Sequence, residues 1–114
     1  MFIQDGAIHS RTMLKIVITD IVMIKGMGNY SKICLKNGKF HLVSRTLKVF
    51  EDLLHESDFL RPSKFCLVNM QYLVVPAKQG VSHLTLLHTT DRVSISRRKI
   101  ATVNELLKKR RLIS

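Results

Sequence analysis

The stretch YSKICLKNGKFHLVS, residues 30–44, decides the fold because it carries the strongest hairpin signal in the sequence. Its first seven residues alternate between apolar and polar side chains, so that Ile33 and Leu35 share one face, as in a half-buried strand. Asn37-Gly38 comes next, and both residues accept the positive φ angles of a type I′ turn. We therefore predict a β-hairpin with Phe40–Ser44 as its return strand.

Short apolar segments on both sides of this hairpin have the composition of further strands. Arg92–Ser96 is expected to pair with the strand before it, with Val93 and Ile95 facing inward. Pro62 lacks a backbone donor and favours extended geometry in its predecessor, so Arg61–Lys64 is predicted to be a loop or a strand edge. The other predicted strands are Met13–Ile18, Asp20–Gly26, Ser82–His88, and two buried ones at Phe65–Val68 and Tyr72–Val75.

In two segments the spacing of the apolar residues changes from the two-residue repeat of a strand to the 3.6-residue repeat of a helix. In Thr46–His55 the apolar residues fall at i, i+3 and i+7, which places them on one face of a short helix. Ser44 or Thr46 is the expected N-cap. The apolar face consists of Leu47, Phe50 and Leu54.

The second helical segment begins at Arg97, with Ser96 as its expected N-cap. Lys108–Arg111 falls in its last turn, where cations complement the helix dipole. Its apolar side consists of Ile100, Val103, Leu106 and Leu107. The expected fold class is therefore mainly β: a compact, elongated multi-strand sandwich or meander with one short inserted helix and a C-terminal helix.

Length and charge limit the kinds of function. A chain of 114 residues suits a single domain over residues 1–114. Nineteen Lys and Arg against eight Asp and Glu give a net charge of +11, which favours a polyanionic partner. Nucleic acid is the leading candidate, and an anionic membrane surface or an acidic protein are the alternatives.

The sequence offers no pattern for catalysis or cofactor binding. Gly26–Gly28 resembles part of a dinucleotide-binding fingerprint, but position 31 is serine and no helical pattern follows. The acids are few and isolated, and the five histidines lack metal-ligand spacing. We therefore predict no enzyme activity, no metal, no cofactor and no small-molecule substrate.

Cysteine usage and the lack of long apolar runs indicate the compartment. Cys34 and Cys66 lie in apolar stretches without a CxxC pair, as in a reduced protein with buried thiols. The sequence shows no secretory signal and no run long enough to cross a bilayer. The expected location is the cytoplasm, without a membrane partner.

The basic residues gather where predicted segments meet. Arg97, Arg98 and Lys99 lie side by side at the start of the C-terminal helix, where cations oppose the helix dipole. A sequence selected only for stability would carry acids there, so we interpret these cations as facing a partner. An arginine fork can engage guanine O6 and N7 or a phosphate. Lys32 and Lys64 fit a functional role and an exposed strand edge equally well.

Three motifs occur in order over about residues 13–108. The first is ITDIVMIKGMGNYSKICLKNGK, a strand that leads into a GNY loop and a hairpin. The second is SRTLKVFEDLLHESDFLRPSKFCLVN, with TL, a short helix, FxR and VN, and the third is VSISRRK. In this order and spacing they resemble the LytTR DNA-binding domain of bacterial response regulators.

The resemblance implies an elongated, mainly β fold whose loops insert into successive major grooves on one face of the duplex. The groove-facing positions that it implies are Ser31, Lys32, Ser63, Lys64 and Arg97. The phosphate or flanking contacts that it implies are Asn29, Arg61, Arg98 and Lys99. Asn69 of the VN pair is expected to have a structural role, capping the following turn.

The chain departs from the family pattern in its central motif. The family often has RxHRSyxVN where this sequence has RPSKFCLVN. Ser63 therefore replaces a histidine, Lys64 an arginine or asparagine, and Phe65 a serine. The family's usual N-terminal receiver domain has no counterpart in these residues, which leaves a stand-alone regulator, a fragment or a domain under another control.

The expected function is sequence-specific binding of double-stranded DNA as a bacterial transcriptional regulator of the two-component type. Two copies, possible as a homodimer on DNA, are expected on promoter repeats about one helical turn apart. A ribosomal-type RNA-binding module is the alternative, although such modules stack bases on aromatics. The aromatics interpreted here as core are Tyr30, Phe40, Phe65 and Tyr72. A third alternative is an interaction domain for acidic protein or anionic lipid.

Overall fold

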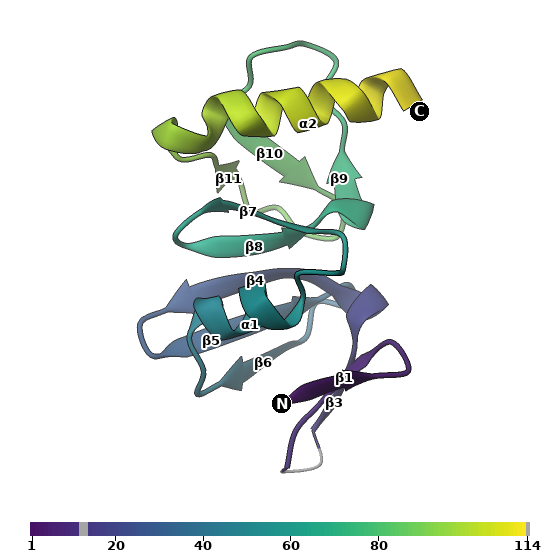
Figure 1. The fold of residues 1–114 in the computed structure, drawn as a ribbon, viewed down its shortest axis with the longest axis vertical. Coiled ribbons are helices and arrows are strands. Elements are labelled where there is room, and N and C mark those ends of the chain that lie inside the picture. The colour runs from purple at the N-terminus through teal and green to yellow at the C-terminus, as the bar shows by residue number, and fades with distance from the viewer. Residues whose placement is uncertain (12–13, 114) are drawn as a thin grey trace.

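The computed structural model describes residues 1–11 and 14–113 and is mainly β (Figure 1). The strands are β1 (Phe2–Gln4), β2 (Ala7–His9), β3 (Lys15–Val17), β4 (Ile21–Met27), β5 (Tyr30–Leu35), β6 (Phe40–Val43), β7 (Phe59–Ser63), β8 (Cys66–Asn69), β9 (Leu73–Val74), β10 (His83–Leu86) and β11 (Val93–Ser94). The helices are α1 (Leu47–Leu53) and α2 (Ile100–Ile113), with short 3-10 helices η1 (Ile18–Asp20), η2 (Met70–Tyr72) and η3 (Arg97–Lys99). The predicted class, with one inserted and one C-terminal helix, is confirmed. No helix in the described residues is long and apolar enough to cross a membrane.

Three antiparallel sheets follow one another along the molecule, which measures 44 × 28 × 25 Å (Figure 1). The central sheet has the strand order β6-β5-β4-β8-β7, and α1 packs on one of its faces. Strands β9, β10 and β11 form a second sheet beneath α2, and β1, β2 and β3 form a third at the N-terminal end. The β10–β11 hairpin confirms the predicted pairing of the last two strands.

The decisive hairpin forms, but its turn is not type I′. Cys34 pairs with Phe40, which leaves one residue more in the loop than a two-residue turn allows. Gly38 alone has a positive φ, of 85°, and its N–H donates to the Leu35 carbonyl at 3.1 Å. This geometry is a three-residue loop that ends in a left-handed glycine. The prediction of a type I′ turn at Asn37-Gly38 is therefore wrong.

Strands β1 and β2 are absent from our predictions, although the sequence signals the turn between them. Asp5 and Gly6 have φ angles of 52° and 72°, and Gln4 pairs with Ala7 across them. Two successive positive φ angles define the type I′ turn, for which Asp-Gly is a preferred pair. The flanking strands have three residues each and are too short to establish a period.

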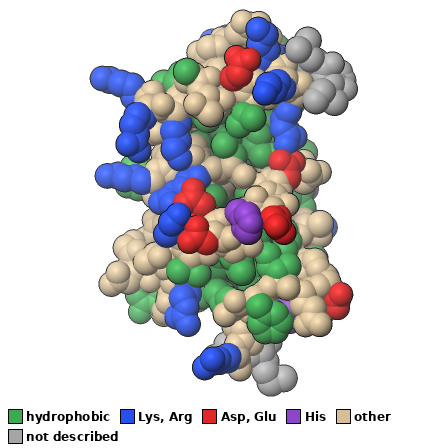
Figure 2. Space-filling model, in the orientation of Figure 1, with side chains coloured by type: hydrophobic (Ala, Val, Ile, Leu, Met, Phe, Trp, Pro, Cys, Tyr) green, Lys and Arg blue, Asp and Glu red, His purple; other side chains and the backbone are tan. Residues whose placement is uncertain are grey.

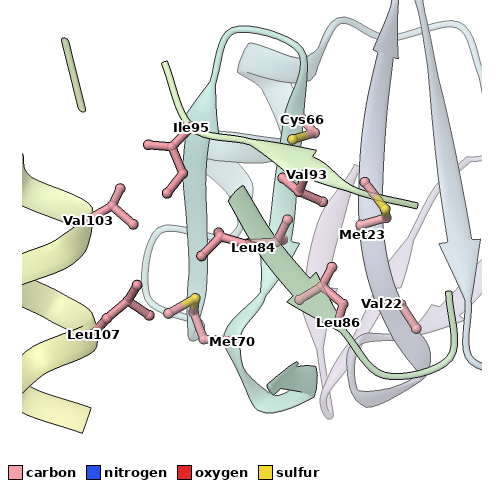
Figure 3. Close-up of a cluster of buried hydrophobic side chains, with 11 residues drawn as sticks. Val22, Met23, Cys66, Met70, Leu84, Leu86, Val93, Ile95, Val103 and Leu107 are labelled. Carbon is pink, nitrogen blue, oxygen red and sulfur yellow. The ribbon is translucent and has the colours of Figure 1, made fainter. Parts of the chain in front are cut away.

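Two clusters of buried apolar side chains lie between these layers. The first lies between α1 and the central sheet and includes the predicted face of Leu47, Phe50 and Leu54. The second joins β4 and β8 to β10, β11 and α2 (Figure 3). Its members include Leu84, Leu86, Val93, Ile95, Val103 and Leu107. The predicted inward orientation of Val93 and Ile95 is confirmed, since both are buried.

Two predictions of burial, for α2 and for the strand at Tyr72–Val75, are wrong. Leu106 is 39% exposed because the buried stripe of α2 runs through Val103 and Leu107, which leaves Leu106 to one side. Tyr72–Val75 is not a buried strand, because β9 lies at the edge of its sheet and Val74 and Val75 are exposed.

Both predicted helices form, but α1 is shorter than the predicted Thr46–His55, and the first turn of the C-terminal helix is the 3-10 helix η3, so that α2 begins at Ile100 and not at Arg97. Thr46 and Ser96 stand at the predicted N-cap positions, but neither side chain makes a capping hydrogen bond. Pro62 lies in β7, an edge strand whose register with β8 is irregular between Leu60 and Ser63. The prediction of a strand edge there is confirmed. Met13, the first residue of one predicted strand, lies outside the described residues.

Candidate nucleic-acid interface

Three connections that are far apart in the sequence lie along one edge of the molecule, on the left in Figure 1. They are the β4–β5 turn (residues 27–30), the β7–β8 turn (residues 63–66) and η3; we name them together the loop edge. Backbone hydrogen bonds join them: Gly26 N–H donates to the Phe65 carbonyl at 2.8 Å, and Ser96 N–H to the Pro62 carbonyl at 2.9 Å. Lys and Arg side chains gather along this side (Figure 2).

Two hollows open at the loop edge. One, of about 520 Å³, lies between the β7–β8 turn and η3, and the other, of about 560 Å³, lies between β4, the β7–β8 turn and residues 91–94. The cations that line the first are Arg61, Lys64, Arg98 and Lys99. Those that line the second are Lys25, Lys32 and Arg92. The two hollows share Ser63, Phe65 and Ser94, so they form one continuous basic surface.

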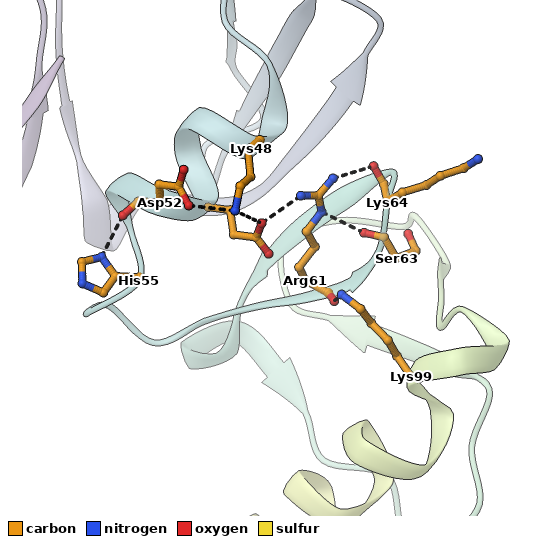
Figure 4. A network of polar contacts seen from close by, with 8 residues as sticks. Lys48, Asp52, His55, Arg61, Ser63, Lys64 and Lys99 are labelled. Carbon is orange, nitrogen blue, oxygen red and sulfur yellow. Dashed lines mark hydrogen bonds and ion pairs between the residues drawn. The ribbon is translucent and has the colours of Figure 1, made fainter.

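The three cations of η3 differ in their exposure. Arg97 and Arg98 are exposed. Lys99 is half-buried, and its Nζ donates a hydrogen bond of 2.7 Å to the Arg61 carbonyl (Figure 4). Arg97 and Arg98 can therefore reach an external partner, whereas Lys99 connects η3 to β7.

Arg61 is occupied by the protein itself (Figure 4). Its Nη1 lies 2.9 Å from Glu51 Oε1 on α1. Its Nε donates to the Ser63 carbonyl at 3.3 Å and its Nη2 to the Lys64 carbonyl at 3.2 Å. The guanidinium thus spans the β7–β8 turn from inside and ties it to α1.

The two serines predicted to face a groove point into the protein. Ser31 has no exposed surface, and its hydroxyl donates to the Arg45 carbonyl at 2.8 Å. Ser63 is only 8% exposed, and its Oγ accepts the Phe65 N–H at 3.1 Å. Both hydroxyls are therefore buried and bonded to backbone in the chain without DNA, and their contact with bases stays a prediction.

Of the remaining predicted positions, Asn29 and Lys64 lie at the loop edge, and Lys32 lies beside it in β5. Asn29 is exposed in the β4–β5 turn. Lys64 is exposed, with its Nζ 5.2 Å from the centre of the Phe65 ring. Lys32 is half-buried, with its Nζ 4.3 Å from the centre of the Phe40 ring.

Sequence reasoning missed the exposed aromatics of this region. Tyr30, Phe40 and Phe65 are 52%, 51% and 64% exposed, so their interpretation as core is wrong, whereas Tyr72 is half-buried. The exposure of Tyr30 could have been predicted, because alternate residues of a strand share a face and Tyr30 therefore lies on the polar face of β5 with Lys32.

The surroundings of the Lys25 ammonium and of both thiols raise the pKa values of these groups. Lys25 forms an ion pair with Asp91, and that hydrogen bond raises the pKa of the ammonium. Burial raises the pKa of the Cys34 and Cys66 thiols, which are both free. Among the described residues, no three His, Cys, Asp or Glu lie close enough together to hold a metal ion.

A family model and a solved structure are both similar to this chain. A family model of the LytTR DNA-binding domain matches residues 11–108. The LytTr DNA-binding domain of a methyl-accepting/DNA response regulator from Bacillus cereus has a similar structure, with a TM-score of 0.70 and 15% identity over 91% of this chain and 98% of that one. No curated protein matches the sequence. Since the family model spans the three motifs and the whole loop edge, the chain belongs to the LytTR family of DNA-binding domains.

Proposed function

We propose that residues 1–114 act as one domain that binds duplex DNA sequence-specifically, as a cytoplasmic bacterial transcription regulator. The loops of the loop edge would enter successive major grooves on one face of the duplex. The observation that carries this proposal is the convergence of three distant connections on one basic edge. A chain of net charge +11 gains affinity by releasing counterions from phosphates, and loops on a rigid edge can then reach bases.

The roles within the loop edge follow from exposure. Arg97 is exposed on η3, and its planar fork suits guanine O6 and N7, so we assign it base recognition. Lys64 and Lys32 lie beside the hollows, within reach of bases or phosphates. Arg98 and Asn29 are exposed next to them and are assigned phosphate contacts.

A selection from randomised duplexes tests this function. We expect an enriched motif that recurs about one helical turn apart, because two copies on one face of the DNA need that spacing. Binding to that motif should weaken steeply with salt, as phosphate contacts require. A selection that enriches no motif would contradict sequence-specific recognition.

A matched pair of variants separates base recognition from phosphate binding. Arg97→Ala should cost about 1–3 kcal/mol on the selected site and relax the preference at one base pair. Arg98→Ala, an exposed neighbour on the same helical turn, should weaken all sequences alike and lower the salt slope by about one. Equal losses on selected and random duplexes for Arg97→Ala would remove its assigned role.

A second candidate function is the binding of single-stranded RNA. The exposed rings of Tyr30 and Phe40 favour it, since such rings can stack on unpaired bases, and Lys32 lies over one of them. Competition between the selected duplex and a single-stranded RNA of equal length, over a salt series, distinguishes the two. RNA that displaces the duplex at equal concentration would favour this candidate.

A further inference from the structure

Phe65 is the most exposed large apolar side chain in the described part of the chain, at 64%. It lies in the β7–β8 turn and belongs to neither buried cluster. It lines both hollows of the loop edge, so its ring stands between them. A single exposed apolar side chain is ordinary on most surfaces, but this one occupies the middle of the basic surface assigned to DNA.

The backbone of Phe65 is held from both sides. Its N–H donates to Ser63 Oγ at 3.1 Å, and its carbonyl accepts the Gly26 N–H at 2.8 Å. The Arg61 guanidinium holds the two preceding carbonyls, of Ser63 and Lys64. The backbone that carries the ring is therefore held in place, which lowers the entropy that a partner must remove on binding.

Cations outnumber acids in both hollows beside the ring, where the acids are Glu51 and Asp91, paired with Arg61 and Lys25. Lys64 Nζ lies 5.2 Å from its centre, Lys32 lines the hollow on one side, and Arg98 lines the hollow on the other. A second copy of this basic chain would be repelled here, whereas a polyanion would be attracted. The occupant that fits both the charge and the family is the DNA duplex.

We propose that Phe65 contacts the C5-methyl group of a thymine in the major groove and is a specificity-determining residue. The thymine methyl is the apolar group that the major groove displays, and a phenylalanine edge can pack against it. Lys64 would hold the adjacent phosphate or base edge while the ring reads the methyl. This inference rests on the proposed duplex recognition and adds a base preference to it.

Uracil substitution tests the contact directly, because it removes the methyl and keeps every hydrogen-bonding group of thymine. Each thymine of the selected duplex is replaced in turn, and the dissociation constant is measured by fluorescence anisotropy. We expect one position at which uracil weakens the wild type about fourfold, the value of one methylene-sized contact of about 0.8 kcal/mol. Phe65→Ala should bind the thymine and uracil duplexes equally at that position.

Two further variants complete the design. Phe40→Ala removes a similarly exposed ring from β6, which does not line either hollow, and should retain the uracil effect. Phe65→Ser, which restores the residue common in the family, should lose the effect as the alanine variant does. It also replaces the alanine variant if that one fails to fold.

The outcomes separate this inference from the proposed function. A selected motif without a required thymine, or a uracil effect that persists in Phe65→Ala and Phe65→Ser, overturns the methyl contact and leaves sequence-specific binding intact. A selection that enriches no motif overturns both. A uracil effect that also disappears in Phe40→Ala overturns the assignment to Phe65, because the loss would then follow from any exposed ring.

Discussion

Replacing Arg61 by alanine tests whether its guanidinium braces the β7–β8 turn or binds a phosphate, the role that the family resemblance implies. In the structure the group donates to Glu51, to the Ser63 carbonyl and to the Lys64 carbonyl, at 2.9, 3.3 and 3.2 Å. The side chains of Arg61 and Glu51 are 21% and 33% exposed. Contacts of this kind stabilise the folded chain itself, so we expect the variant to be less stable without DNA.

The size of the loss follows from these contacts. A hydrogen bond with a charged partner contributes about 1.5–3 kcal/mol to stability. Because both partners are partly exposed, the contribution of the Arg61–Glu51 ion pair falls to about 1 kcal/mol or less. The two bonds to carbonyls are long and contribute toward the low end. We therefore expect Arg61→Ala to lower the free energy of unfolding by about 2 kcal/mol. At this chain length the loss corresponds to a fall of about 8 °C in the melting temperature.

Urea unfolding followed by circular dichroism measures the stability, and duplex binding over a salt series measures the phosphate contacts. A brace predicts lower stability with an unchanged salt slope, because the Arg61 guanidinium then bonds to the protein and not to a phosphate. Arg98→Ala is the control, with unchanged stability and a slope lower by about one. Glu51→Gln should reproduce part of the instability. Unchanged stability with a slope lower by about one in Arg61→Ala would refute the brace.

Three further predictions concern stability and thiol reactivity. Asn69→Ala should lower the free energy of unfolding, measured in urea, by about 2 kcal/mol. The reason is that the Asn69 amide donates to the buried Ile21 carbonyl at 2.8 Å, and alanine leaves that carbonyl without a donor. A loss below about 0.5 kcal/mol would contradict this. Gly38→Ala should cost about 1–2 kcal/mol because φ is 85°, and a neutral result would contradict the turn geometry. Iodoacetamide at pH 8 should label Cys66 more slowly in the native chain than in urea, because burial raises the thiol pKa and leaves less thiolate; equal rates would contradict this.

Elements with a long, regular period could be predicted from the sequence, and short ones could not. The hairpin of β5 and β6 and the apolar face of α1 each repeat their pattern often enough to identify the structure. Strands β1 and β2 span three residues each, so no period can develop. The type of the turn at Gly38 depends on one extra residue in the loop, which the Asn-Gly pair alone does not disclose. The structural role of Asn69 is confirmed, since its Oδ1 accepts the Gln71 N–H at the start of η2.

Within the candidate site, the alternation of inward and outward side chains along β5 could have predicted the burial of Ser31. Ser31 is two residues before Ile33, so the alternation that buries Ile33 also buries Ser31. The burial of Ser63 and the partners of Arg61 could not be predicted, because they depend on the irregular register of β7 with β8 and on the position of α1. Sequence patterns show that cations lie at junctions between elements, but only the tertiary contacts decide which of these cations remain free to bind a partner.

Those contacts divide the basic residues into inner cations, which bond to the protein, and outer cations, which are exposed. Lys99 and Arg61 bond to backbone carbonyls, and together with the Ser96–Pro62 hydrogen bond they join η3 to β7. The exposed cations that flank this junction include Arg97 and Lys64, and these contacts fix the spacing of their backbones before a partner binds. A fixed spacing lowers the entropy lost on binding and limits the duplex geometries that satisfy both side chains at once. If the proposed duplex recognition holds, we expect the inner cations to contribute to specificity through the positions that they impose on the outer ones.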